Sequence, residues 1–119
     1  MGGYGVDAVA EFVWGHVVSQ FLRGAVRLHI LHHADIEPVH GAWMTEELAG
    51  HGYNISPGTL YPMLHRMQHD GLLTSRTEVV DGRARRVYAI TDKGRAVLVE
   101  ERTALAELAA EVLGRQEDS

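Results

Sequence analysis

The chain has 119 residues and no cysteine, which suits one domain with an appendage and excludes disulfides and thiolate metal sites. Its N-terminal apolar stretch lacks a basic flank and is interrupted by Glu11, Gly15 and His16, so we expect no signal peptide, no membrane span and a cytoplasmic protein. The formal net charge is -5, but residues 56–95 carry seven Lys or Arg against four Asp or Glu. Such a basic segment suits a surface that faces phosphates, although an ordinary solvated surface would show the same pattern.

Helices are predicted for the first third of the chain. Apolar residues at intervals of three and four over residues 9–21 predict an amphipathic helix that needs a partner to pack against. A second helical run over residues 22–33 continues it. Residues 36–41 contain Pro and Gly and predict a short strand or turn. A short helix over about residues 43–50 then follows.

The next predicted helix has a clearly marked start and end. Ser56 offers a hydroxyl for the N-cap, and Pro57 occupies the first turn, where its missing N–H costs nothing. Gly71 ends the helix. Its apolar face consists of Leu60, Met63, Leu64 and Met67. The polar residues on the other side are left exposed to a partner or to solvent.

A β-hairpin and a long helix complete the pattern. Residues 72–80 and 86–91 are rich in Leu, Val, Thr and Tyr and flank Asp81-Gly82, a strong signal for a two-residue hairpin turn. The last helix is predicted from residue 92 to about residue 113, and its apolar stripe again needs a partner helix. That stripe consists of Leu98, Leu105, Leu108 and Val112.

This order predicts a mainly α fold with a small β wing, that is, a winged helix-turn-helix domain with dimerisation helices at both ends. The expected parts are an N-terminal dimerisation helix (1–21), a DNA-binding domain (22–91), a C-terminal dimerisation helix (92–114) and a frayed tail (115–119). A helix of this kind enters the major groove, while an Arg-tipped hairpin is suited to contact the neighbouring backbone. We therefore predict sequence-specific binding to double-stranded DNA.

The chain also resembles the PadR family of bacterial transcriptional regulators over about residues 22–98. Its matching blocks occur in the family's order and at the family's intervals. They are Leu22-Arg23-Gly24, His40-Gly41, Ser56 to Pro62, Leu64 to Met67, Gly71-Leu72-Leu73, Gly82-Arg83, Arg85 to Tyr88, Thr91 and Lys93-Gly94. The sequence departs from the family at Ala42-Trp43, where a tyrosine usually follows the glycine.

The resemblance implies a homodimeric repressor that binds an inverted repeat and releases it on meeting a small effector. The chain length resembles the short branch of the family, which has a single C-terminal dimerisation helix. Two copies would place their reading helices about 34 Å apart, one turn of DNA. A dimeric adaptor that binds a protein partner through the same fold is the alternative.

The candidate DNA-contacting residues lie on the reading helix and the hairpin. Ser56 is interpreted more as a cap than as a contact, and Arg66 could instead form an internal ion pair. Alternation places Arg85 and Arg86 on opposite faces of their strand, so only some of the arginines need reach DNA. The full set is Ser56, Pro57, Gly58, Thr59, Tyr61, His65, Arg66, Arg83, Arg85 and Arg86.

Histidine is unusually frequent, with eight in the chain. His29 and His33 are four residues apart and could bind one metal ion from a single helix face, which suggests a metal-responsive regulator as a further alternative. A third ligand would then come from His16, His40 or a dimer mate. Surface histidines without a ligand are the plainer interpretation, and no cofactor is predicted.

The aromatic residues suggest an effector pocket. Phe12, Trp14, Phe21 and Trp43 could line a pocket at the dimer interface for a small hydrophobic or aromatic molecule, although such residues more often belong to the core. The sequence contains no set of nucleophile, base and orienting residue and no phosphate-binding glycine loop, so we predict that the protein is not an enzyme.

Overall fold

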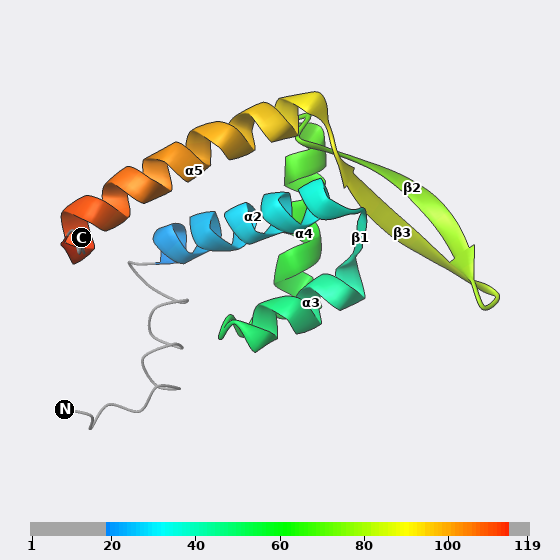
Figure 1. Ribbon diagram of the computed structural model, residues 1–119. Helices are drawn as coiled ribbons and strands as arrows, with labels where there is room; N and C mark the ends of the chain where they lie inside the picture. Colours follow the sequence, from blue (N-terminus) through cyan, green and yellow to red (C-terminus); the bar gives the residue numbers. More distant parts are fainter. Residues whose placement is uncertain (1–18, 115–119) are drawn as a thin grey trace, which may run out of the picture.

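The computed structural model describes residues 19–114 (Figure 1). Residues 1–18 of the N-terminal helix expected over residues 1–21, and the tail expected at 115–119, lie outside the described residues. Among residues 19–114, no helix is long and apolar enough to cross a membrane. The elements are α2 (Ser19–Ile36), β1 (Val39–His40), α3 (Gly41–Gly50), α4 (Pro57–His69), β2 (Leu73–Val80), β3 (Arg83–Ile90) and α5 (Asp92–Leu113).

The helices gather on one side of the molecule and the hairpin extends from the other (Figure 1). α5 runs above α2, α4 crosses behind α2, and α3 lies below it. The three strands form an antiparallel sheet in the order β1-β3-β2. This arrangement confirms the predicted mainly α fold with a small β wing.

The core lies where α2, α3 and α4 meet the base of the sheet. Three of the four apolar residues predicted for α4, Leu60, Leu64 and Met67, are buried. Met63 is only partly buried beside them. Tyr88 of β3 and Leu98 of α5 join the same core, so the wing and the last helix are both attached to the helical domain.

Three predicted boundaries differ from the structure. Ser19 to Phe21 are the first residues of α2, so the domain boundary placed after residue 21 falls inside one helix. α3 begins at Gly41, immediately after β1. β3 begins at Arg83, three residues earlier than predicted, because the two-residue turn allows pairing up to Val80 and Arg83.

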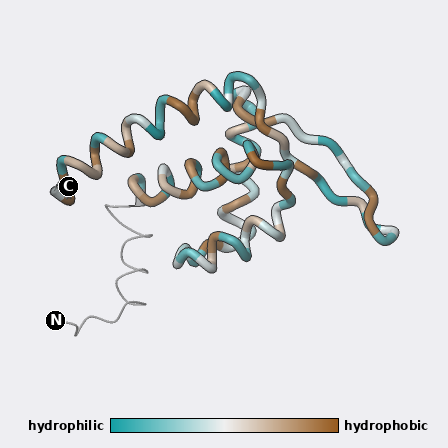
Figure 2. The backbone as a smooth tube through the Cα atoms, in the orientation of Figure 1, coloured by the Kyte–Doolittle hydropathy of each residue, from teal (hydrophilic) through white to brown (hydrophobic). Residues whose placement is uncertain are grey.

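The hairpin turn takes the conformation that Asp81-Gly82 predicts. Both residues have positive φ, 53° at Asp81 and 75° at Gly82, which is the pattern of a type I′ turn. This turn matches the twist of the two strands and keeps them paired to the end. The tip is hydrophilic (Figure 2), as expected for a surface that contacts a charged partner.

The start of α5 is fixed against the end of α4 by a compact group of polar contacts. The Thr91 hydroxyl accepts a hydrogen bond from the Gly94 N–H at 2.9 Å, which caps the helix, and donates one to the Gly71 carbonyl at 2.6 Å. The Lys93 ammonium donates to the Asp70 carbonyl at 2.8 Å. A Cβ atom on Gly94 would lie 2.2 Å from the Leu72 carbonyl oxygen, so only glycine fits here.

We predict that Gly94→Ala destabilises the fold by about 1–3 kcal/mol or more, because a backbone atom cannot move aside without displacing α5. Gly50→Ala is the matched control, since a Cβ atom there meets nothing within 4 Å. Urea unfolding followed by circular dichroism measures both. Equal stability of the two variants would contradict the close packing at Gly94.

Candidate nucleic-acid interface

The outward face of α4 is the natural reading surface of this fold. Leu60 and Leu64 point into the core, which turns His65, Arg66 and His69 outward, where all three are exposed. Pro62 lies on the same exposed side, and the helix continues through it. α4 ends at His69 with Asp70 as its C-cap, and Gly71, predicted to stop the helix, follows with a φ of 82°. The surface that could meet DNA is thus one continuous helix face.

The N-terminus of α4 is open, and its cap differs from the prediction. Ser56 occupies the N-cap position, but its side chain makes no capping hydrogen bond. Its hydroxyl lies 3.5 Å from the Thr59 hydroxyl instead, so the predicted hydroxyl cap is wrong. Ser56, Pro57 and Gly58 are exposed and Thr59 is half-buried. The positive end of the helix dipole and two hydroxyls therefore face outward together.

Tyr61 is packed against the start of α3. A Cβ atom on Gly41 would lie 2.4 Å from the Tyr61 hydroxyl oxygen and 2.5 Å from two ring carbons. Gly41 is buried, whereas Tyr61 keeps 39% of its surface exposed. The glycine of the His40-Gly41 block thus creates the space that holds Tyr61 at the edge of the reading face.

The wing arginines divide into two groups. Arg83, Arg85 and Arg86 are all exposed. The Arg86 guanidinium donates to the Ser75 hydroxyl at 3.0 Å, and Ser75 donates to the Gln68 side-chain oxygen at 3.0 Å, which ties the wing to α4. Within residues 19–114, the side chains of Arg83 and Arg85 form no hydrogen bond or ion pair.

Two further arginines, Arg23 and Arg27, lie near the reading helix, and neither was predicted to contact DNA. Arg66 has its ion pair with Asp70 at 3.6 Å, and it lines a hollow of about 660 Å³ between α2 and α4 together with Arg23 and Arg27. Arg27 is paired with Glu101. Arg23 is exposed and adds positive charge beside α4 through a fold contact that linear spacing does not reveal.

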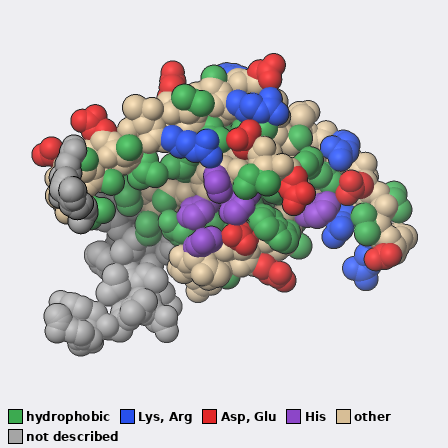
Figure 3. All heavy atoms as spheres, viewed as in Figure 1, with side chains coloured by type: hydrophobic (Ala, Val, Ile, Leu, Met, Phe, Trp, Pro, Cys, Tyr) green, Lys and Arg blue, Asp and Glu red, His purple; other side chains and the backbone are tan. Residues whose placement is uncertain are grey.

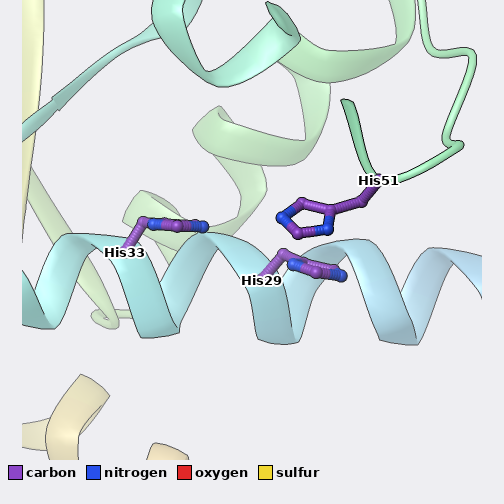
Figure 4. Close-up of side chains that lie close together, drawn as sticks. All are labelled: His29, His33 and His51. Carbon is purple, nitrogen blue, oxygen red and sulfur yellow. The ribbon is translucent and has the colours of Figure 1, made fainter. Parts of the chain in front are cut away.

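The structure also assembles a histidine cluster, which we define as His29, His33 and His51 (Figure 4). His29 and His33 lie one turn apart on α2, and His51 reaches them from the end of α3. Of the three sources expected for a third ligand, His40 is not part of this cluster, because its Nε2 lies 3.9 Å from the Glu78 carboxylate. His16 is outside the described residues, and His51 was not among the expected sources. Figure 3 shows histidine side chains gathered at the centre of one face.

The surroundings of His29 and His33 favour neutral rings, because they lower the pKa of both. Burial lowers the pKa of His29, and the nearby His51 and His33 lower it further. Burial also lowers the pKa of His33, against the opposing effect of Glu47. The Glu47 carboxylate lies 3.0 Å from the His51 Nε2 and 3.3 Å from the His33 Nε2. Neutral imidazole is the form that binds metal ions.

Only two of the four aromatic residues of the suggested effector pocket lie within the described residues, and these two are not brought together. Phe12 and Trp14 lie outside the described residues. Phe21 lines a groove of about 620 Å³ between α2 and α5. Trp43 lies elsewhere, with its ring 5.2 Å from that of His33. Of the described pair, only Phe21 therefore faces the groove.

The comparisons with known proteins agree with this geometry. Residues 30–100 match the model of the "Transcriptional regulator PadR-like family". The transcriptional regulator Rv3488 of Mycobacterium tuberculosis is 67% identical over 99 residues, which cover 83% of this chain and 92% of that protein. The chain belongs to the PadR-like family of transcriptional regulators.

Solved structures of PadR regulators share the fold. The crystal structure of a PadR family regulator from Eggerthella lenta is 31% identical, with a TM-score of 0.71, and the match covers 86% of this chain and 90% of that one. A PadR-like regulator from Bacillus cereus is 33% identical, with a TM-score of 0.72, over 78% and 92% of the two chains.

Membership of the PadR-like family decides the class of function. The protein is a DNA-binding transcriptional regulator and not an enzyme, because the family and its similar relatives are transcriptional regulators. The DNA-binding class is thereby favoured over the adaptor that binds only a protein partner.

We predict that Gly41→Ala displaces the Tyr61 ring and destabilises this PadR-like protein by about 1 kcal/mol, the low end of an overpacking cost, because the methyl group and the ring need the same space but a ring that is 39% exposed can move aside. In a Tyr61→Ala background the same change should cost nothing, since the space is then empty. A double-mutant cycle from urea unfolding measures the coupling between the two positions. Additive effects would show that Tyr61 is not the obstacle.

Proposed function

We propose that the protein is a cytoplasmic, homodimeric repressor that binds an inverted-repeat operator and releases it when a small effector binds. The observation that carries the DNA-binding part is the position of Arg83 and Arg85. Their guanidinium groups have no partner within residues 19–114. Glu78, which stands opposite Arg85 across the hairpin, is 3.5 Å from Arg76 instead. Unpaired arginines on a projecting hairpin are suited to phosphate oxygens.

The contacts in the proposed complex divide between the helix and the wing. Residues 56–59 would bind phosphate at the N-terminus of α4 through backbone N–H groups and the hydroxyls of Ser56 and Thr59. Tyr61 and His65 would meet base edges or the sugar-phosphate backbone. Arg83 and Arg85 would contact the neighbouring backbone. Arg66 and Arg86 would contribute less, because both already have partners within the chain.

The dimer in this proposal is supported by apolar surface that one chain leaves uncovered. Phe21, Leu105, Leu108 and Val112 are between 44% and 67% exposed. The first three line the groove between α2 and α5, whose lining is mostly apolar. Exposed apolar patches of this extent are typical of interaction surfaces. A second copy of α5 is a suitable occupant, because its own stripe would be covered in the same contact.

The effector would be a small hydrophobic or aromatic molecule at the edge of this groove, next to Phe21. A volume of about 620 Å³ lies within the range of sites for drug-sized ligands. Such a molecule would favour a dimer in which the two reading helices are wrongly spaced for the operator. It could shift that balance only by its difference in affinity for the two dimer arrangements.

We predict that Arg83→Ala and Arg85→Ala each weaken binding to operator DNA and lower the slope of log affinity against log salt by about 0.9 for each phosphate that the variant no longer neutralises. The DNA is the tightest sequence selected from a random pool, and fluorescence anisotropy is measured at several salt concentrations. Arg95→Ala is the control of equal charge, because Arg95 is held by Asp35 and Asp92. Equal slopes in all variants would contradict a role for the wing.

We predict that Leu105→Glu converts the protein to a monomer, because it places a charge in the groove that the partner covers. Thr103→Glu adds the same charge at an exposed position of α5 that does not line the groove and should remain dimeric. Sedimentation equilibrium measures both. A dimer in the Leu105→Glu variant, or a monomer in the unmodified protein, would refute this interface.

A further inference from the structure

Three histidines from two helices converge on one point of the surface. The ring nitrogens of His29, His33 and His51 that face one another all lie within 4.8 Å. In a tetrahedral site with Zn–N bonds of about 2.0–2.1 Å, ligand nitrogens lie roughly 3.3 Å apart. Small rotations of the rings would bring the nitrogens from this separation to that of a tetrahedral site. Figure 4 shows that the rings already lie on the same side of α2.

The backbone that carries these histidines is held by helix hydrogen bonds and by packing against the core. His29 and His33 lie in the interior of α2, and each is followed by a residue of the buried core, Ile30 or Ala34. His51 is the C-cap residue of α3. The Gly52 N–H donates to the Ala49 carbonyl at 3.0 Å and the Tyr53 N–H to the Leu48 carbonyl at 2.9 Å, which is a Schellman motif. This motif fixes the direction in which His51 leaves the helix.

A fourth group provides negative charge beside the cluster. The Glu47 side chain lies one turn before His51 on α3, and the same carboxylate oxygen faces Nε2 of both His33 and His51. α2 thus offers His29 and His33, and the facing end of α3 offers Glu47 and His51. The two residues of each pair are four positions apart in the sequence. Carboxylates of this kind orient metal-binding imidazoles and raise their affinity.

We propose that His29, His33 and His51 bind one divalent transition-metal ion, with Glu47 as the residue that positions the rings. Imidazole nitrogens suit zinc, nickel and copper, whereas magnesium and calcium prefer oxygen ligands. Zinc fits best, because three protein ligands with a fourth position open to water form a common zinc arrangement. The site would join α2 to the end of α3.

The position of the site connects it to DNA binding. His51 is followed by the segment of residues 52–56 that leads into the reading helix α4, and His29 also lines the groove between α2 and α5. An ion that holds α2 against α3 would therefore restrict both the segment before α4 and the α2 side of the groove. This regulatory part rests on the proposed DNA-binding function, whereas metal binding itself does not.

The first test is zinc binding by isothermal titration calorimetry, on the full chain made without a histidine tag. We expect one ion per chain, a loss of affinity of more than about a hundredfold for His33→Ala and His51→Ala, and a loss of about tenfold to a hundredfold for Glu47→Gln. His69→Ala, a distant exposed histidine, should bind as the unmodified protein does. Equal affinity in all four variants would overturn the site.

A spectroscopic test locates the ion without changing any of the residues proposed to bind it. The Trp43 ring lies 5.2 Å from the His33 ring. The chain has only two tryptophans, so in Trp14→Phe all tryptophan emission, excited at a wavelength that tyrosine does not absorb, comes from Trp43. Cobalt should quench this emission, and zinc added first should prevent the quenching. Persistent quenching in the presence of zinc would place the cobalt elsewhere and overturn the proposal.

The regulatory part is tested by DNA affinity with and without zinc, using the sequence selected from a random pool. We expect a change of at least about fivefold in the unmodified protein and none in His33→Ala. Zinc binding without a change in DNA affinity would overturn the regulatory part alone. Failure to bind DNA under every condition would overturn the proposed function, and the calorimetric result would still stand.

Discussion

The close approach of Gly94 to the Leu72 carbonyl is the constraint on which the arrangement of the other elements depends. At this point the end of α4, the start of β2 and the start of α5 share one set of backbone contacts. The Leu72 carbonyl also accepts a hydrogen bond from the Thr91 N–H at 3.1 Å. Because glycine brings the two backbones together, the hydroxyl of Thr91 can cap α5 and bind Gly71 at the same time. The directions of the wing and of α5 are therefore set by the same few atoms.

The direction in which α5 leaves Gly94 places this helix over α2, where two polar contacts hold it. Glu101 pairs with Arg27, and the Arg102 guanidinium lies 3.1 Å from the His32 Nδ1. Beyond Leu98, the apolar residues of α5 leave the core and become exposed. The helix is thus anchored at its first half and presents its second half as a surface. An orientation fixed relative to α4 is what two reading helices need if a dimer is to hold them at a defined spacing.

Local signals in the sequence were sufficient for most of the fold. Asp81-Gly82 and Gly71 take the positive φ values that their residue types favour, and the apolar spacing of α4 predicted its buried face. The errors arise where the decisive contact is distant in sequence. Nothing near Gly41 shows that Tyr61 occupies the space of its missing side chain, and nothing near His33 indicates His51. At Ser56 a local signal itself fails, because the residue type predicted a helix cap that the side chain does not form.

α2 is the element through which the proposed activities would influence one another. One side of this helix supplies Val26, Ile30 and Leu31 to the core, a second lines the groove against α5, and a third carries the histidine cluster. His29 belongs to both of the latter two. Because one helix of 18 residues carries all three surfaces, a displacement of its backbone by an ion on one face would also displace the surface that a partner contacts on another. Reciprocity then requires that any effect of metal on dimer geometry be matched by an equal effect of dimer geometry on metal affinity.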